Sequence, residues 1–220
     1  PEVICLQETR LSPNSPANLR KYSMYSASPN QGIGTQGGVA ILIKDGVPHS
    51  PINISSNYQI IATQVTLHKV LTICSIYLPP SEKKKKKNIE DIISQLPPPV
   101  LLLGDFNAHS TMWGHQKTDT KGSEIENLLT YNNLCLLNNK TPTYLHPALG
   151  SLTAIDLAIG DPSMAIDLTW RTEDDTHGSD HFPIILEATQ PSNEEQQEFW
   201  KLKNANWIMF QQQCDHLITE

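Results

Sequence analysis

The stretch that decides the fold reads Val100-Leu101-Leu102-Leu103-Gly104-Asp105-Phe106-Asn107. Four apolar residues in a row indicate a short buried β-strand, and Gly104 with the polar residues after it indicates a turn. Pro97-Pro98-Pro99 directly before the strand would end any preceding helix. Asp105 and Asn107 are equally well explained as turn formers or as catalytic groups, which proteins commonly display where strands end.

Similar short β-type runs, separated by loops, make up most of the chain on both sides of this stretch. Val70–Tyr77 follows Ile60–Leu67 so closely that the two are expected to form a hairpin. The other predicted strands are Val3–Leu6, Val39–Ile43, Cys135–Leu137, Ile155–Ile159, Asp167–Trp170 and Phe182–Ala188.

Helical spacing of apolar residues is found in two places between these strands. The segment 88–96 has Asn88 as a candidate N-cap. The segment Ser123–Leu129 has Ser123 and Glu126 placed as a capping box. Strands mixed with helices in this order predict an α/β or α+β layered fold.

Charge and composition exclude some function classes. The chain of 220 residues carries 16 Lys and Arg against 23 Asp and Glu, a net charge of −7, so it has no uniformly basic nucleic-acid-binding surface. A protein of this charge that acts on a phosphodiester needs a divalent cation to offset the repulsion. Lys83–Lys87 concentrates five of the basic residues, and we expect a solvated loop there rather than a DNA-contacting element.

The domain organisation follows from the change in composition near residue 190. Residues 1–190 are predicted to form one globular domain, and 191–220 a polar linker followed by helices of a neighbouring region. The chain begins without Met at the entry to a strand, which suggests a piece of a longer protein. No apolar run approaches the roughly 20 residues of a membrane span, and no signal peptide is evident. The scattered cysteines favour a reduced intracellular setting over a disulfide framework or zinc site; they are Cys5, Cys74, Cys135 and Cys214.

Further polar residues stand at strand ends or interrupt strands. Glu8 alone reads best as a solvated strand end, and Tyr77 alone as half-buried packing. Asp156 lies inside an apolar run, where a carboxylate is costly unless it is paired. Asp180-His181 is either a turn before a strand or an oriented base. Taken together these residues match one chemistry, the hydrolysis of a phosphodiester.

That hydrolysis needs a cation and an activated water. Glu8 and Asp180 supply hard oxygen ligands that suit Mg²⁺. Asp105 is the candidate acceptor of the water's proton, with Asn107 fixing the geometry.

The charge that develops on the phosphorus centre needs hydrogen-bond donors. His181, Asn107 and the Tyr77 hydroxyl are the candidates. Asp156 is suited to hold the tautomer of the imidazole and raise its basicity.

Six motifs, in order over about residues 1–190, resemble the successive motifs of the endonuclease/exonuclease/phosphatase superfamily. Within it, they are most similar to the apurinic/apyrimidinic-endonuclease-like domain of non-LTR retrotransposons of the Jockey-related kind. The motifs are Ile4–Thr9, Gly37–Ile41, Ile76-Tyr77, Gly104–Asn107, Ile155–Leu157 and Ser179–Ile184. The resemblance implies a four-layered α/β sandwich of two mixed β-sheets flanked by helices. Here it would lack its first strand, which bears an active-site Asn, and its first helix.

The resemblance also implies a role for each matching residue. Glu8 would ligate the metal with Asp180 at or near it, and Asp105 would activate the water or protonate the leaving group. The remaining implied catalytic residues are Asn107 and Tyr77 as phosphate contacts, and His181, oriented by Asp156, as phosphate ligand or base. Supporting positions are Thr143, Thr153 and Ser179. His109, His115 and Trp113 either line the DNA side of the cleft or pack in a loop.

The implied function is a Mg²⁺-dependent endonuclease, with Mn²⁺ as a possible substitute, that nicks target DNA for retrotransposition. Its implied partners are double-stranded DNA and a reverse transcriptase domain of the same polyprotein, to which the segment 206–218 would connect. The DNA target implies a nuclear location, and no membrane partner is expected. Two alternatives stay open: a phosphatase of a small phosphate ester on the same fold, and an inactive retroelement fragment.

Overall fold

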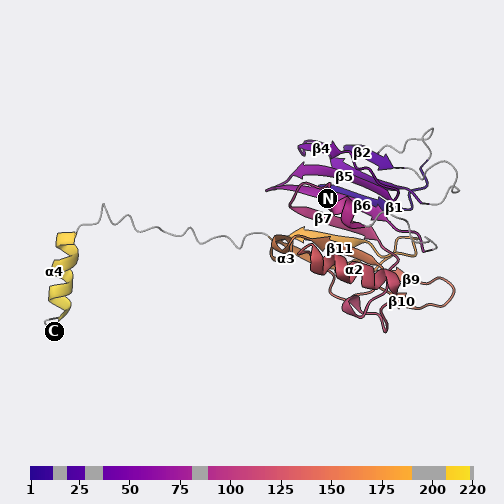
Figure 1. Ribbon diagram of the computed structural model, residues 1–220. Coiled ribbons are helices and arrows are strands. Elements are labelled where there is room, and N and C mark those ends of the chain that lie inside the picture. Colours follow the sequence, from indigo (N-terminus) through magenta and orange to yellow (C-terminus); the bar gives the residue numbers. More distant parts are fainter. Residues whose placement is uncertain (12–18, 28–36, 81–88, 190–206, 219–220) are drawn as a thin grey trace. The chain divides into compact units, whose positions relative to one another are not determined.

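The computed structural model of the protein describes residues 1–11, 19–27, 37–80, 89–189 and 207–218 (Figure 1). Residues 1–189 form one compact unit and 190–220 a second. In the second unit the described part is one helix, α4 (Trp207–Ile218). None of the helices in these ranges is long and apolar enough to cross a membrane. The expectations for Lys83–Lys87 and the Asn88 cap fall outside the described residues.

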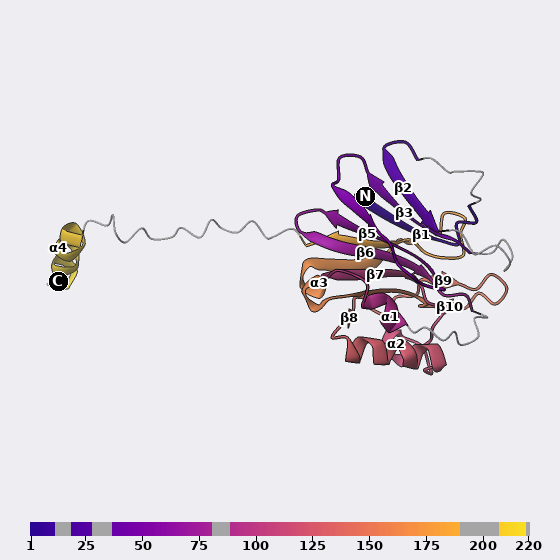
Figure 2. The ribbon, with the colours of Figure 1, turned by 45° about the horizontal axis from the view of Figure 1, so that its top comes forward.

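A six-stranded mixed sheet forms the centre of the first unit (Figure 2). Its only parallel pair is β6 with β7, and the other neighbours are antiparallel. The predicted hairpin is confirmed, because β5 and β6 pair along their whole length. In spatial order the strands are β4 (His49–Ile52), β5 (Gln59–Thr66), β6 (Val70–Tyr77), β7 (Val100–Asp105), β11 (Asp156–Gly160) and β8 (Cys135–Leu136).

Three smaller sheets surround the central one. A three-stranded antiparallel sheet has the order β1-β3-β2, and two pairs stand apart from it as β9 with β10 and β12 with β13. Their bounds are β1 (Val3–Gln7), β2 (Tyr22–Ala27), β3 (Val39–Lys44), β9 (Tyr144–Leu145), β10 (Leu152–Thr153), β12 (Leu168–Thr172) and β13 (Ile184–Ala188).

Two hydrophobic cores lie on opposite faces of the six-stranded sheet. One joins it to the helices α1 (Ile89–Ile93) and α2 (Thr120–Tyr131) and includes the fully buried Phe106. The other lies between this sheet and the three-stranded sheet, where Ile41 and Ile43 are fully buried. Stacked sheets with helices outside are the expected α/β sandwich. Among the described residues no helix covers the outer face of the three-stranded sheet (Figures 1 and 2).

The predicted capping box at Ser123 and Glu126 is wrong. α2 begins one turn earlier, with Asp119 as its N-cap accepting a hydrogen bond from Gly122 N (2.6 Å). Glu126 instead accepts hydrogen bonds from the hydroxyls of Ser110 and Thr118. A side chain already held by another loop cannot reach back to cap its own helix.

Two short helical elements were not predicted. They are α3 (Pro162–Asp167) and a 3₁₀ turn, η1 (Thr111–Trp113). Trp113 is fully buried and its indole N–H donates to Ala108 O (3.0 Å). Of the two roles expected for it, lining the DNA side of the cleft or packing in a loop, the structure shows loop packing.

A groove of about 790 Å³ runs between β1 and β13. Each of these strands is paired on one side alone, β1 with β3 and β13 with β12. The wall of the groove is mainly apolar, and one end of it is lined by the acidic residues described next.

Candidate active site

The register of three adjacent strands brings their polar ends together. Tyr77 at the end of β6 pairs with Asp105 at the end of β7, and Asp105 pairs with Asp156 at the start of β11. β7 runs parallel to β6 and antiparallel to β11, so all three residues lie at the same edge of the sheet. The structure therefore gathers residues that lie up to 79 positions apart in the sequence.

Asp105 lies at the centre of this edge and is only 3% exposed. Its two carboxylate oxygens accept hydrogen bonds from the backbone N–H of Asn107 (2.9 Å) and from the Asn107 side-chain amide (2.7 Å). Burial and the negative charge of Asp156 raise the pKa of Asp105 to about 7, against the opposing effect of His181. An acid with this pKa can both take and give a proton near neutral pH.

The loop after β7 holds Asn107 in an unusual backbone conformation. Asn107 has a φ of +46°, in the left-handed region, and its amide also donates to Leu78 O (3.2 Å). Glu8 has a φ of +49° directly after β1. Five further non-glycine residues of the described chain also have a positive φ, so this conformation does not by itself mark the site.

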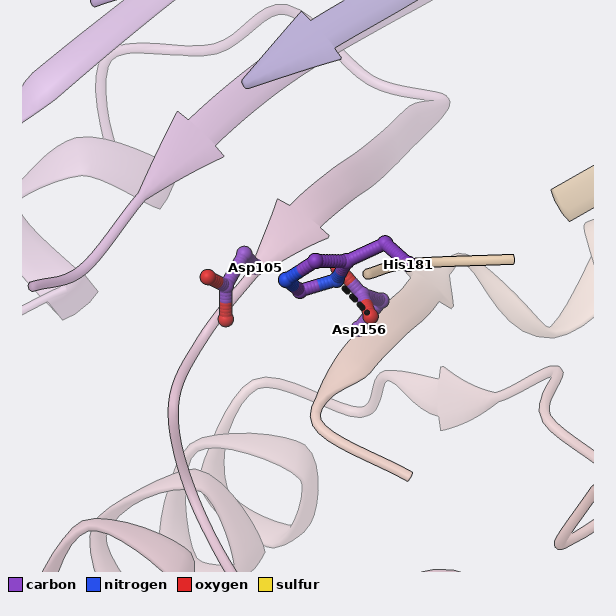
Figure 3. A group of neighbouring side chains, drawn as sticks. All are labelled: Asp105, Asp156 and His181. Carbon is purple, nitrogen blue, oxygen red and sulfur yellow. Dashed lines mark hydrogen bonds and ion pairs between the residues drawn. The ribbon is translucent and has the colours of Figure 1, made fainter. Parts of the chain in front are cut away.

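His181 and Asp156 form a hydrogen-bonded pair beside Asp105. Nδ1 of His181 lies 2.8 Å from Oδ2 of Asp156, and the imidazole lies between the two carboxylates (Figure 3). Ligand atoms of all three residues lie within 4.8 Å of one another. Burial lowers the pKa of His181, but the hydrogen bond and charge of Asp156, with the charges of Asp105 and Asp180, raise it to about 9. The imidazole is therefore a cation that can donate from its second nitrogen.

Glu8 and Tyr77 form a second hydrogen-bonded pair of the site. The Tyr77 hydroxyl donates to Oε1 of Glu8 (2.6 Å), and Arg10 approaches Oε2 (3.4 Å). Burial, followed by the hydrogen bond to Glu8, raises the pKa of Tyr77 well above its usual value, so the phenol stays protonated. Tyr77 thus holds the Glu8 carboxylate in place.

Asp180 lies in the loop before β13. The three expected supporting residues, Ser179, Thr143 and Thr153, make hydrogen bonds in this loop and in the segments beside it. The hydroxyl of Ser179 accepts from the backbone N–H of His181 (3.1 Å). The buried hydroxyl of Thr143 accepts from the backbone N–H groups of Ile155 and Asp156, both at 3.1 Å. Thr153 pairs with Thr143 through its backbone, its carbonyl accepting from Thr143 N (2.8 Å).

Five of the seven predicted site residues line one end of the groove: Glu8, Asp105, Asp156, Asp180 and His181. Tyr77 and Asn107 lie behind them through the hydrogen bonds to Glu8 and Asp105. The seven residues therefore converge on one place.

The donor set at this place fits a divalent cation. Four carboxylates line the groove end with oxygen donors, the ligands preferred by hard cations; they belong to Glu8, Asp105, Asp156 and Asp180. Burial, followed by the negative charges of Asp156 and Glu8, raises the pKa of Asp105, and a cation bound here would offset those charges. Oδ2 of Asp156 is already hydrogen-bonded to His181, and both oxygens of Asp105 accept hydrogen bonds from Asn107.

Two further groups lie next to the site. His109 is held by Asp119, with Nδ1 to Oδ2 at 2.9 Å, and its ring meets the His115 ring edge-on at 4.4 Å. Nε2 of His115 lies 2.9 Å from Ala154 O. Both imidazoles are thus anchored on the loop after β7, and contact with DNA stays a prediction.

The sequence reasoning missed Tyr144, whose ring packs on His181 with 4.8 Å between centroids. Tyr144 belongs to the two-residue strand β9. A strand this short gives no periodic pattern, so nothing in the sequence alone marked the residue.

A family described as endonuclease-reverse transcriptase matches residues 71–185, more than half of the chain. The chain belongs to this family. The matched segment includes Tyr77, Asp105, Asn107, Asp156, Asp180 and His181.

Curated relatives of this family member are RNA-directed DNA polymerases of mobile elements from Drosophila melanogaster. The RNA-directed DNA polymerase from mobile element jockey is 28% identical over 98% of this chain. The probable RNA-directed DNA polymerase from transposon X-element is 24% identical over 84% of it. The chain covers 24% and 21% of their lengths, respectively. It therefore corresponds to about a quarter of such a protein.

Solved structures with the same fold include the endonuclease domain of TRAS1, a telomere-specific non-LTR retrotransposon. Its TM-score is 0.68 at 20% identity, with 85% of each chain covered. An endonuclease/exonuclease/phosphatase family protein from Leptotrichia buccalis gives a TM-score of 0.52 at 16% identity, covering 76% of this chain and 70% of that one. These similarities show the fold, an α/β sandwich.

Proposed function

We propose that this chain is a divalent-metal-dependent endonuclease domain that nicks double-stranded DNA for the insertion of a retroelement. The observation that carries the proposal is the convergence of Glu8, Asp105, Asp180 and the His181–Asp156 pair at one end of the groove. The family membership and the names of the curated relatives support a place beside a reverse transcriptase in one polyprotein. A chromosomal DNA target implies that the domain works in the nucleus.

In the proposed reaction a water attacks the scissile phosphorus. Asp105 accepts a proton from that water, since its pKa near 7 suits it to general base catalysis at neutral pH. Protonation of the leaving oxygen is the alternative role that the same pKa allows. Asn107 fixes the orientation of the Asp105 carboxylate through its two hydrogen bonds.

Charge that develops on the phosphoryl oxygens is stabilised by hydrogen-bond donors already in place. His181, held by Asp156 and positively charged, presents its second ring nitrogen toward Asp105 (Figure 3). Tyr77 donates to Glu8 in the free protein, so its contact with phosphate requires that bond to be shared or exchanged.

Glu8 and Asp180 are the proposed ligands of the cation, with Mg²⁺ the ion that suits a few carboxylates and several waters. When bound, the cation neutralises the phosphate and the charge that develops on it. The net charge of −7 makes this neutralisation a requirement for DNA to approach the acidic site.

The alternative on the same fold is hydrolysis of a small phosphate ester. The relatives named as polymerases of mobile elements favour DNA over such a substrate. The third possibility is an inactive retroelement fragment. The hydrogen bonds from Asn107 to Asp105 and between His181 and Asp156 are present, which argues against it.

A nicking assay on supercoiled plasmid, run beside a phosphate-release assay on small esters, separates these readings. We expect Mg²⁺-dependent conversion of supercoiled to open-circular DNA, abolished by Asp105→Ala and by His181→Ala. Asp45→Ala, an exposed carboxylate in a turn, is the matched control and should leave nicking unchanged. Unchanged nicking in either site variant would refute the role given to that residue, and phosphate release without nicking would select the alternative.

A further inference from the structure

The loop that carries His181 is held by the short strand β9. Leu145 N donates to Asp180 O and Phe182 N donates to Thr143 O, each at 2.8 Å, and Tyr144 forms a β-bridge with His181. Tyr144 is thus the residue of β9 that lies directly opposite His181. Directly opposed residues of antiparallel strands bring their side chains into contact.

The side chains of this pair do meet. The ring centroids of Tyr144 and His181 lie 4.8 Å apart with the planes tilted by 55°, within the range of favourable aromatic contacts. The Tyr144 ring also meets His146 edge-on, with centroids 6.1 Å apart. The Tyr144 ring therefore has a second aromatic contact within its own hairpin.

The other contacts of the His181 side chain within the described part of the chain lie at its ring nitrogens. Nδ1 is bonded to Asp156, and the far side of the ring faces Asp105 (Figure 3). A hydrogen bond at one nitrogen holds that nitrogen in place but leaves the ring free to rock about the bond axis. The Tyr144 ring, which contacts the imidazole at a tilt of 55°, is placed to restrain that motion.

We propose that Tyr144 is a positioning residue for His181. Its aromatic ring fixes the plane of the imidazole. The hydrogen bond to Asp156 is thereby kept, and the second ring nitrogen stays directed at the reacting phosphate. Only the catalytic part of this inference rests on the proposed function. The contact of the ring with the His181–Asp156 pair stands without it.

The ring, rather than the hydroxyl, is the part that acts. Among the described residues the structure gives the Tyr144 hydroxyl no hydrogen-bond partner. Slight burial and the charges of Asp180, Asp105 and Glu8 raise the pKa of Tyr144, so the phenol is neutral. Replacement by Phe should therefore keep the function of Tyr144, whereas an aliphatic residue of similar bulk should not.

The test is the NMR signal of the His181 Nδ1–H proton in the metal-free chain. A proton held between imidazole and carboxylate exchanges slowly enough with water to be observed downfield of the amide signals. We expect this signal in the parent chain and in Tyr144→Phe, and its loss by exchange broadening in Tyr144→Leu. Tyr131→Leu is the matched control on a highly exposed tyrosine of α2 and should keep the signal.

Nicking kinetics give an independent second readout. We expect Tyr144→Phe to stay within about twofold of the parent chain, and Tyr144→Leu to lose roughly 10- to 100-fold in kcat, since a misplaced catalytic group has effects of this size. KM should change little, because the substrate does not depend on the ring for binding.

The outcomes separate the two proposals. A Tyr144→Leu chain that keeps both the signal and kcat overturns the positioning role, as does a parent chain without the signal. A Tyr144→Phe chain as impaired as Tyr144→Leu would assign the effect to the hydroxyl and also overturn it. Failure of the parent chain to nick would refute the proposed function alone, while the NMR signal still decides on Tyr144.

Discussion

A buried carboxylate with a second carboxylate beside it is the feature that distinguishes Asp105. Burial and the charge of Asp156 both disfavour its ionised form. Ionised Asp105 therefore costs the folded state free energy. The donors on Asn107 and the cationic His181 offset part of this cost. Such unfavourable placement is typical of residues kept for catalysis rather than for stability.

This placement predicts that the stability of the metal-free chain falls as the pH rises. The pKa of Asp105 is near 3.8 in the unfolded chain and about 7 in the folded chain. The contribution of this carboxyl to stability is therefore fully present below pH 3.8 and is lost as the pH rises through about 7. The raised pKa of His181 acts in the same direction, its contribution being lost between about 6.5 and 9. Thermal melts from pH 5 to 9 should show a falling Tm.

Asp105→Asn is the variant that isolates the carboxylate. It should raise the Tm at pH 8 by a few degrees, roughly 2–4 °C for each kcal/mol in a chain of this size, while it abolishes nicking. The gain over the parent chain should shrink toward pH 5. A Tm below that of the parent chain at pH 8 would show that the ionised carboxylate stabilises the fold.

At the scale of elements, the sequence was informative where strands are apolar. All the predicted strands are present, with ends shifted by at most two residues, because continuous apolar runs leave few alternatives to a buried strand. Four strands escaped prediction, namely β2, β4, β9 and β10. β4 contains Pro51 at a sheet edge and β9 and β10 have two residues each, so tertiary pairing rather than local pattern defines them.

The same limit applies to the site. Residues at the ends of apolar strands, such as Glu8 and Asp105, were found because the strand pattern pointed to them. Tyr144 was not, since its position depends on a long-range bridge to His181. The helix cap was misplaced by one turn because Glu126 has partners in a distant loop.

The observed cap of α2 gives a test at this scale. Asp119→Ala removes the acceptor for Gly122 N and for His109, and should cost about 1 kcal/mol of unfolding free energy. Burial raises the Asp119 pKa, but its hydrogen bonds to Gly122 and His109 lower it overall, so the contribution is lost as the pH falls through the folded pKa. Denaturant titration at pH 7 should show the loss.

Ser123→Ala is the control for the cap, and it should be nearly neutral. Equal losses in the two variants would restore Ser123 as the capping residue.

Gly104 in β7 is a position where the sheet admits no side chain. It has a φ of +153°, and an added Cβ would overlap the backbone carbonyl of Ile76 on the neighbouring strand. Gly104→Ala should destabilise the chain by roughly 1–3 kcal/mol or more. Gly150→Ala, with a φ of +63° but open space around it, should cost only about 1 kcal/mol. Chemical denaturation of both variants compares the two effects, and equal losses would mean that β7 can move away from Ile76.

At the scale of the whole molecule, the groove between β1 and β13 exposes two strand edges beside the site. Glu2 O accepts from Lys44 N, so the even-numbered residues of β1 pair with β3 and the N–H of Cys5 faces the groove. Unpaired edges attract further strands.

Amide hydrogen exchange tests whether the β1 edge is open in solution. The N–H of Cys5 should exchange much faster than those of Ile4 and Leu6, which lie in the ladder with β3. Equal protection of the three amides would show that another strand covers this edge, and the mass in solution would tell whether it comes from a second copy.

The central claim is that one end of this groove binds a divalent cation through Glu8 and Asp180, beside Asp105. Anomalous scattering from crystals soaked in Mn²⁺ measures the position of the ion directly. We predict a single strong peak within ligand distance of the Glu8 carboxylate at the groove end, lost in Glu8→Gln and kept in Glu124→Gln, an exposed glutamate of α2. Peaks confined to other acidic patches, or an ion held by the Asp156 carboxylate away from Glu8, would contradict it.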